Sequence, residues 1–125
     1  MARYFADTYA LVEILRGSPA YRPYADEELV TTEFNLLELA YALTRDYGRV
    51  KALEVLALVR AFIEIVETRD EDYVEAAELR ARLRREGRRL SLIDALGYAV
   101  ARRLGIPFLT GDREFRGLDG VVFVK

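Results

Sequence analysis

The chain has 125 residues, 52% of them hydrophobic and 32% charged, which is typical of one folded domain rather than a disordered chain. Its formal net charge of −2 argues against a polycation that binds nucleic acid through overall charge. Without Cys or His, it has no disulfide, no thiolate or imidazole catalyst and no zinc site built on those side chains. Any bound metal would be held by oxygen, which favours Mg²⁺ or Mn²⁺.

Short apolar segments alternate with helical patterns through the first half of the chain. Gly17 and Gly48 end two of the predicted helices, and Thr31 or Thr32 caps the second of them. The predicted elements are a strand over 3–6, a helix over 8–15, a short helical piece over 18–24, a strand over 29–31, a helix from there to about 47 and a helix over 49–60.

The second half continues the alternation. Residues 62–66 alternate like a half-buried strand, and residues 70–86 form a charged helix whose apolar stripe is Val74, Ala77 and Leu83. Ser91 opens a further helix that runs to residue 104, and strands follow over 107–109 and 121–124. This order predicts a parallel sheet covered on both faces by helices.

The sequence shows no linker or repeat, so residues 1–125 are expected to form a single domain. No apolar stretch approaches the roughly 20 residues that cross a bilayer. The first residues lead directly into a strand-like segment without the apolar core of a signal peptide. We therefore expect no membrane association and a cytoplasmic location.

Four acidic residues stand within or directly after apolar segments: Asp7, Glu38, Asp94 and Asp112. An isolated carboxylate in apolar surroundings is costly unless it is paired, protonated or bound to a cation. Two of the acids follow predicted strands, and two lie in the first halves of predicted helices. Because ligands of open α/β sheets bind beyond the carboxyl ends of the strands, we expect the four acids on one rim, where they would hold metal.

Each acid also has a purely structural interpretation. Asp7 can cap the helix that follows it, and Asp112 fits an ordinary turn. Ser91 and Asp94 have the spacing of a capping box. Glu38 has no Lys or Arg three or four positions away, but it can lie in a solvated stripe of its helix.

Six arginines lie in the second half of this charged helix and directly after it: Arg80, Arg82, Arg84, Arg85, Arg88 and Arg89. Arg80, Arg84 and Arg88 are spaced by four residues and so share one helical face, which could contact the phosphates of a nucleic acid. We favour the alternative that this is a solvated face partly neutralised by Glu78 and Glu86.

The acidic segments, taken in order, make the chain similar to the PIN-domain family, particularly the VapC-like toxins of prokaryotic toxin–antitoxin pairs. The segments that carry the resemblance are Phe5-Ala6-Asp7-Thr8, residues 32–39 around Glu38, residues 90–95 ending in Asp94-Ala95 and continuing over 101–105, and residues 108–115 around Thr110-Gly111-Asp112. Together they span essentially the whole chain.

This resemblance implies a three-layer α/β/α sandwich with a central parallel sheet of about five strands. It implies a Mg²⁺- or Mn²⁺-dependent endoribonuclease, with an RNA substrate, a homodimer and a cognate antitoxin protein. Its catalytic and metal-binding acids correspond to Asp7, Glu38, Asp94 and Asp112, and its supporting hydroxyls to Thr110 and Thr8. In such a site the carboxylates hold one or two ions, which activate a water for attack on the phosphodiester.

Two other functions stay open from the sequence. A PIN-like fold can serve as a non-catalytic protein-interaction module. An α/β protein of the receiver or phosphatase type could instead use Asp7 as its phosphate acceptor. A haloacid-dehalogenase-like phosphatase would carry another Asp two positions on, where this chain has Tyr9, and a receiver would carry a late-strand Lys that is not evident.

Overall fold

A computed structural model describes residues 2–125 and contains one sheet of five parallel strands. The strands are β1 (Arg3–Ala6), β2 (Glu28–Thr31), β3 (Glu64–Ile65), β4 (Phe108–Thr110) and β5 (Val121–Phe123). They lie in the order β3-β2-β1-β4-β5, and every neighbouring pair is parallel. The predicted central parallel sheet of about five strands is confirmed.

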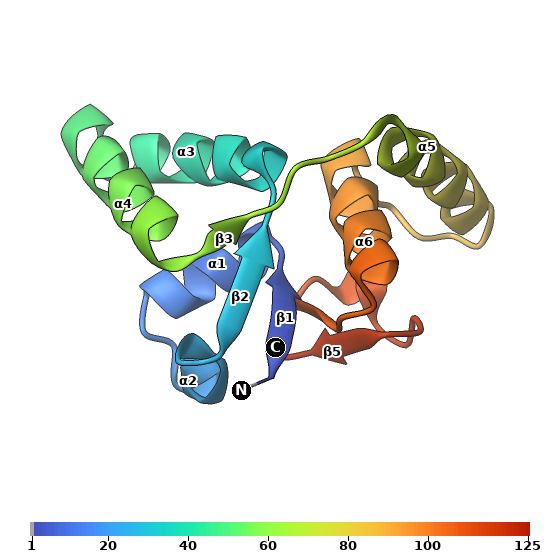
Figure 1. Ribbon diagram of the computed structural model, residues 1–125, viewed down its shortest axis with the longest axis horizontal. Helices are drawn as coiled ribbons and strands as arrows, with labels where there is room; N and C mark the ends of the chain where they lie inside the picture. Colours follow the sequence, from blue (N-terminus) through green and yellow to red (C-terminus); the bar gives the residue numbers. More distant parts are fainter. Residues whose placement is uncertain (1) are drawn as a thin grey trace.

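Helices cover both faces of this sheet, so the predicted three-layer sandwich is also confirmed (Figure 1). The helices are α1 (Thr8–Leu15), α2 (Arg22–Ala25), α3 (Glu33–Tyr47), α4 (Arg49–Phe62), α5 (Asp70–Arg85) and α6 (Leu92–Leu104). Single 3₁₀ turns span Pro19–Tyr21 and Arg113–Phe115. Within residues 2–125, no helix combines the length and the apolar character that a membrane crossing requires.

Alternation along the short strands divides the interior into two cores. Phe5 and Phe108 stack with ring centroids 5.6 Å apart and pack with α5 and α6. Their chain neighbours Ala6 and Leu109 point to the opposite face, which α1 to α4 cover. Gly97 in α6 permits this packing, since a Cβ there would lie 3.0 Å from the Phe5 ring.

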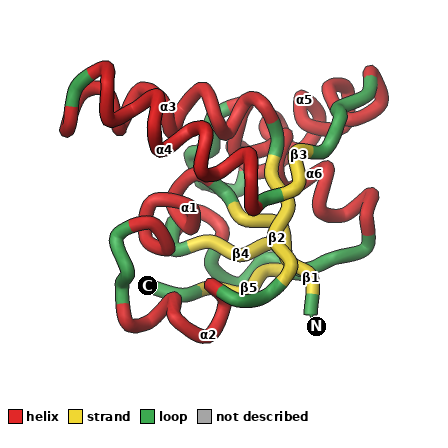
Figure 2. Tube along the Cα trace, turned by 60° about the vertical axis from the view of Figure 1, so that its left-hand side comes forward, coloured by secondary structure: helices red, strands yellow, loops and turns green. Residues whose placement is uncertain are grey.

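The central strand β1 is the point where the connections of the sheet change direction. From β1 the chain continues to β2 on one side, and β4 pairs with β1 on the other. Figure 2 shows the strands side by side, with the helices around them. In open α/β sheets, ligands bind beyond the carboxyl ends of the strands at such a switch point. A ligand site is therefore expected at the carboxyl ends of β1 and β4.

The third strand is shorter than its alternating pattern predicts. Helix α4 continues to Phe62, and the amide of Ile63 donates to Val59 O at 2.8 Å, so the helix takes the first part of the predicted strand. Phe62 is 81% exposed, and only Glu64 and Ile65 pair with β2. A two-residue edge strand gains little from pairing, so the preceding helix decides its start.

The buried face of α5 also differs from the predicted stripe. Val74 and Ala77 are exposed, and the face that packs on α6 carries Asp72, Ala76 and Leu79 together with Leu83, as predicted. Asp72 is accommodated because Arg103 of α6 forms a two-pronged ion pair with it, at 2.8 and 2.9 Å. This long-range pair turns an acidic position inward, which the residue types alone do not suggest.

Candidate active site

The structure brings the four predicted acids to one hollow of roughly 580 Å³. Asp7 follows β1 directly, Asp112 comes two residues after β4, Glu38 lies in α3 and Asp94 in the first turn of α6. The remaining lining residues are Thr8, Tyr9, Leu37, Tyr41 and Ile93. The hollow therefore lies at the carboxyl ends of the two central strands, where the fold places a ligand site.

Asp7 is the most deeply buried of the four acids, with 3% of its surface exposed. Its Oδ1 accepts from the Ala10 amide at 2.8 Å, so Asp7 does cap α1, and its Oδ2 accepts from the Thr110 hydroxyl. Burial raises the pKa of Asp7 to about 7; the bonds from Thr110 and Ala10 oppose the shift, and the nearby charges of Asp94 and Asp112 add to it. The carboxylate is thus held in place at an electrostatic cost.

Asp94 and Asp112 each use one oxygen for a local cap. Oδ2 of Asp94 accepts from the Ser91 amide at 3.0 Å, and Oδ1 of Asp112 accepts from the Glu114 amide at 3.0 Å. Within residues 2–125, no hydrogen-bond donor contacts the second oxygen of either acid. Burial raises the pKa of Asp94, with Asp112 adding to the shift and the bonds from Ser91 opposing it. The capping roles thus leave each acid an oxygen for a ligand.

A chain of polar side chains positions Glu38. Its Oε1 accepts from the Thr8 hydroxyl at 2.6 Å, and that hydroxyl in turn accepts from Asn35 Nδ2 at 3.1 Å. Thr32, which caps α3, donates through its hydroxyl to Asn35 Oδ1 at 2.7 Å. Burial raises the pKa of Glu38; the bond from Thr8 opposes this, and the charge of Asp94 adds to it. Asn35 is a supporting residue that sequence reasoning missed, although it stands three positions before Glu38.

Gly111 is a second residue that sequence reasoning missed. A Cβ at this position would lie 2.1 Å from Tyr9 Cε1 and 2.5 Å from the carbonyl oxygen of Val124. Its backbone does not need the freedom of glycine, since its φ is not positive. The turn from Thr110 to Asp112 is therefore held tightly against α1 and the last residues of the chain. Only a residue without a side chain fits between the hydroxyl and the acid.

The four acids offer only carboxylate oxygens as metal ligands. Oxygen is the ligand atom that a hard divalent cation such as Mg²⁺ or Mn²⁺ prefers. The present spacing is more open than a closed cage: within residues 2–125, no three acidic side chains lie close enough to share an ion as arranged. Ion binding would therefore need rotation of these side chains or bridging waters. Among residues 2–125, no Lys or Arg lines the hollow, so none of these side chains pairs directly with its carboxylates.

The raised pKa of Asp7 predicts how the metal-free protein responds to pH. Between 3.8 and about 7 the folded chain keeps a proton on Asp7 that the unfolded chain releases, so stability falls as pH rises and levels off above about 7. The whole effect is on the order of 4 kcal/mol. The measurement is the free energy of unfolding against pH in EDTA. Asp7→Asn should remove the largest part of the slope; an unchanged slope would contradict this assignment.

Solved structures with the same fold cover almost the whole chain. VapC20 from Mycobacterium tuberculosis, described as a toxin that cleaves the sarcin–ricin loop, is 23% identical, with a TM-score of 0.77 over 98% of this chain and 99% of that one. DNA-bound VapBC from Salmonella typhimurium is 20% identical, with a TM-score of 0.78 over 98% and 97%. VapBC-5 from M. tuberculosis, described as a member of the VapBC family of toxin–antitoxin systems, is 24% identical, with a TM-score of 0.72 over 100% and 99%.

No curated protein matches the chain in sequence at a significant level. The family model described as PIN domain, in contrast, matches residues 4–121. This match includes all four acids of the hollow, all of β4 and all of β1 except Arg3. The protein therefore belongs to the PIN-domain family, and its fold is that of the VapC toxins.

Proposed function

We propose that the protein is a divalent-metal-dependent ribonuclease that hydrolyses RNA phosphodiester bonds at the acidic hollow. The observation that carries the proposal is the convergence of four carboxylates, from four separate segments, on one partly buried hollow. The chain has no Cys or His, so thiolate and imidazole chemistry are absent. Family membership supports nuclease activity, and the similar VapC20 is described as a toxin that cleaves the sarcin–ricin loop.

The geometry suggests a role for each acid. Asp7, held on both oxygens, provides a rigid base for the site, and Thr110 fixes its orientation. Asp94 and Asp112 each have an unbonded oxygen available for a cation, and Glu38 is kept in position by Thr8. A bound Mg²⁺ or Mn²⁺ would lower the pKa of a water and offset the charge of the phosphate. The raised pKa values of Glu38 and Asp94 suit a carboxylate that accepts the proton of the attacking water.

The first test is RNA cleavage in Mg²⁺ or Mn²⁺, compared with EDTA and with Asp94→Asn. Asn keeps an oxygen that can accept from the Ser91 amide but is a poor ligand for a hard cation. We expect metal-dependent cleavage by the wild type and a loss of at least about 100-fold in the variant, in the range of removing one stabilising group. Equal cleavage by wild type and variant would contradict the site.

A matched control separates the two roles of Asp94. Ser91→Ala removes the hydroxyl that accepts from the Asp94 amide at 3.0 Å and leaves the carboxylate unchanged. The variant should lose about 1 kcal/mol of stability. It should nevertheless retain most of its cleavage. A fold check by melting temperature accompanies both variants. If no sample cleaves any RNA tested, the non-catalytic interaction module becomes the better proposal.

We also propose that the protein is the toxin of a toxin–antitoxin pair, because two of the similar structures are described as VapBC assemblies. An apolar hollow of roughly 510 Å³ between α1, α3 and α4 could receive an antitoxin segment, with Leu15, Leu39 and Val55 among its lining residues. The product of a neighbouring reading frame should co-purify with the chain and suppress RNA cleavage. Leu15→Glu should weaken that association, and failure of any neighbour to bind would contradict the pairing.

The exposed face of α4 supports a homodimer. Val50 and Leu53, three residues apart on α4, are 72% and 56% exposed, and Phe62 at the end of the helix is 81% exposed. Exposed apolar side chains of this size can form a contact between two copies of the chain. Sedimentation at several protein concentrations should show a dimer for the wild type and a monomer for the Leu53→Lys, Phe62→Lys double variant. Val74→Lys, on the exposed side of α5, is the control and should stay dimeric. A wild-type monomer at all concentrations would exclude the homodimer.

A further inference from the structure

We propose that five arginines beside the acidic hollow form a phosphate-binding track that leads a single RNA strand into it. The arginine track consists of Arg80, Arg84 and Arg85 in α5 and of Arg88 and Arg89 in the loop before α6. The inference rests on the proposed ribonuclease function and extends it from the reacting bond to the strand on either side.

The guanidinium groups of the track form no ion pair in the described chain, although the backbone amide of Arg89 donates to the Glu114 carboxylate. Within residues 2–125, no Arg between 80 and 89 forms an ion pair, whereas six arginines elsewhere do. Neither Glu78 nor Glu86 forms an ion pair with them, so any neutralisation of this solvated face acts without direct contact. Arg84 and Arg89 are exposed and have no side-chain hydrogen bond in the described chain. Their guanidinium groups are free to bind phosphate, which they match in geometry.

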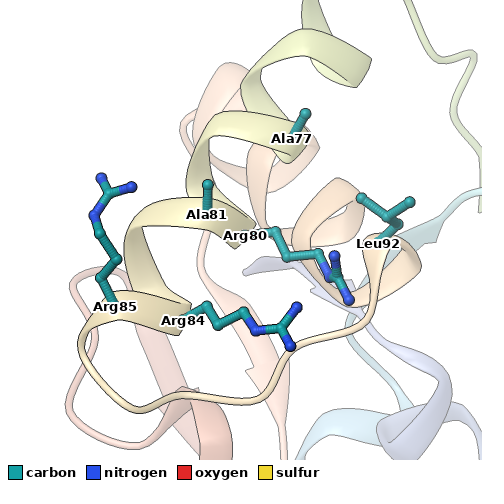
Figure 3. Close-up of a pocket in the computed structure, with 6 residues that line it drawn as sticks. All are labelled: Ala77, Arg80, Ala81, Arg84, Arg85 and Leu92. Atoms are coloured by element: carbon teal, nitrogen blue, oxygen red, sulfur yellow. The ribbon is translucent and has the colours of Figure 1, made fainter.

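Two hollows give the track its shape. The first, of roughly 430 Å³, is lined by Arg80, Arg84, Arg85, two alanines of α5 and Leu92. The second, of roughly 760 Å³, shares Arg80 and Arg84 with the first and continues to Arg89. Figure 3 shows that the guanidinium groups of Arg80 and Arg84 extend in the same direction, toward Leu92 and the loop before α6, while Arg85 points away. The two hollows are therefore adjacent, with Arg80 and Arg84 lining both.

Arg80 and Arg88 hold the track in place through backbone contacts. Arg80 Nε donates to Leu90 O at 3.0 Å, and Arg88 Nη1 donates to Glu114 O at 2.7 Å and to Arg116 O at 2.9 Å. These bonds tie the end of α5 and the following loop to the 3₁₀ turn of residues 113–115. Two of the five charges, those of Arg80 and Arg88, are therefore positioned before any ligand binds.

The track reaches the acidic hollow from two sides. Leu92 lines the first arginine hollow and its neighbour Ile93 lines the acidic hollow, so the first turn of α6 separates the two. On the other side, Arg88 contacts the backbone carbonyl of Glu114, which lies in the 3₁₀ turn capped by Asp112. A strand that crosses the first turn of α6 would therefore pass from the arginines to the carboxylates.

Charge indicates that the ligand is a phosphate backbone, and the proposed ribonuclease function makes that backbone RNA. The acidic hollow has no Lys or Arg in its lining and repels a polyanion before a cation binds. Two cationic side chains lie over the rings of tyrosines that line the acidic hollow: Arg45 over Tyr41 and Lys125 over Tyr9. Arg45 also forms an ion pair with Asp46. The track is the larger group of unpaired cations near the hollow. It contains no aromatic side chain, so it should bind the backbone without reading the bases.

The test measures binding of a single-stranded RNA in EDTA, where cleavage is absent, over a series of salt concentrations. Arg84→Gln with Arg89→Gln removes two track charges without removing a side-chain bond. The matched control, Arg22→Gln with Arg49→Gln, removes two exposed charges that form no ion pair in the described chain and that lie away from the track, in α2 and at the start of α4 (Figure 1).

We expect the track variant to bind RNA several-fold more weakly than the control. Its slope of log affinity against log salt should fall by about 1.4, because each lost phosphate contact lowers the slope for a single strand by about 0.7. In Mg²⁺, the KM for a long RNA should rise while kcat stays close to that of the wild type. If the double variant is poorly folded, Arg84→Gln alone should give half of the change in slope.

The outcomes separate this proposal from the ribonuclease proposal. Equal affinity and equal salt slope in the track variant and the control would overturn the arginine track, even if the wild type cleaves RNA. The arginines would then be a candidate binding site for an acidic protein segment. Absence of RNA binding by the wild type in EDTA would overturn it as well. A wild type that binds RNA through the track but never cleaves it would instead remove the catalytic proposal and leave the track intact.

Discussion

Burial of the Asp7 carboxylate at the end of the central strand is the constraint on which the candidate site depends. Little of Asp7 is exposed to solvent, so its charge is stabilised mainly by the Ala10 amide of α1 and by the Thr110 hydroxyl at the end of β4. One side chain thus joins the central strand, the helix after it and a strand more than a hundred residues further along. The acidic hollow exists only when all three are assembled.

The other acids add charge to this position and raise the electrostatic cost further. Burial and mutual repulsion raise the pKa values of Asp7, Glu38 and Asp94, and no positively charged side chain lines the hollow. A bound divalent cation would relieve that repulsion and stabilise the folded chain by mass action. The arrangement therefore sacrifices stability in the metal-free state to gather carboxylate oxygens around one hollow, as is common at functional sites.

Opposite charges are kept apart on either side of the first turn of α6. The carboxylates lie on one side, and arginines without acidic partners lie on the other. This separation matters because an arginine within the hollow would pair with the acids and neutralise them. Placed outside, the arginines can offset the charge of a long ligand while the carboxylates remain available to a cation. The same turn also contains the capping box of Ser91 and Asp94, which fixes its geometry.

Local patterns predicted most elements and the four acids, because periodicity, caps and glycine stops act over a few residues. The capping interpretations of Asp7 and Asp94 were correct as well, and they do not compete with a ligand role, since a carboxylate has two oxygens. Patterns predicted less well where a distant contact decided the outcome. Residue types favoured Val74 as part of the buried stripe of α5, but the ion pair between Asp72 and Arg103 turned a different face inward.

The sequence by itself determined the parallel α/β architecture, the absence of Cys and His chemistry, and which four acids stand in apolar segments. The tertiary structure alone decided that these acids share one hollow, that Asn35 supports Glu38 through Thr8, and that Gly111 must lack a side chain. The physical reason is the distance along the chain over which each interaction acts. Helix and strand patterns reflect neighbours within a few residues, whereas desolvation, close packing and repulsion between charges depend on which distant segments the fold brings together.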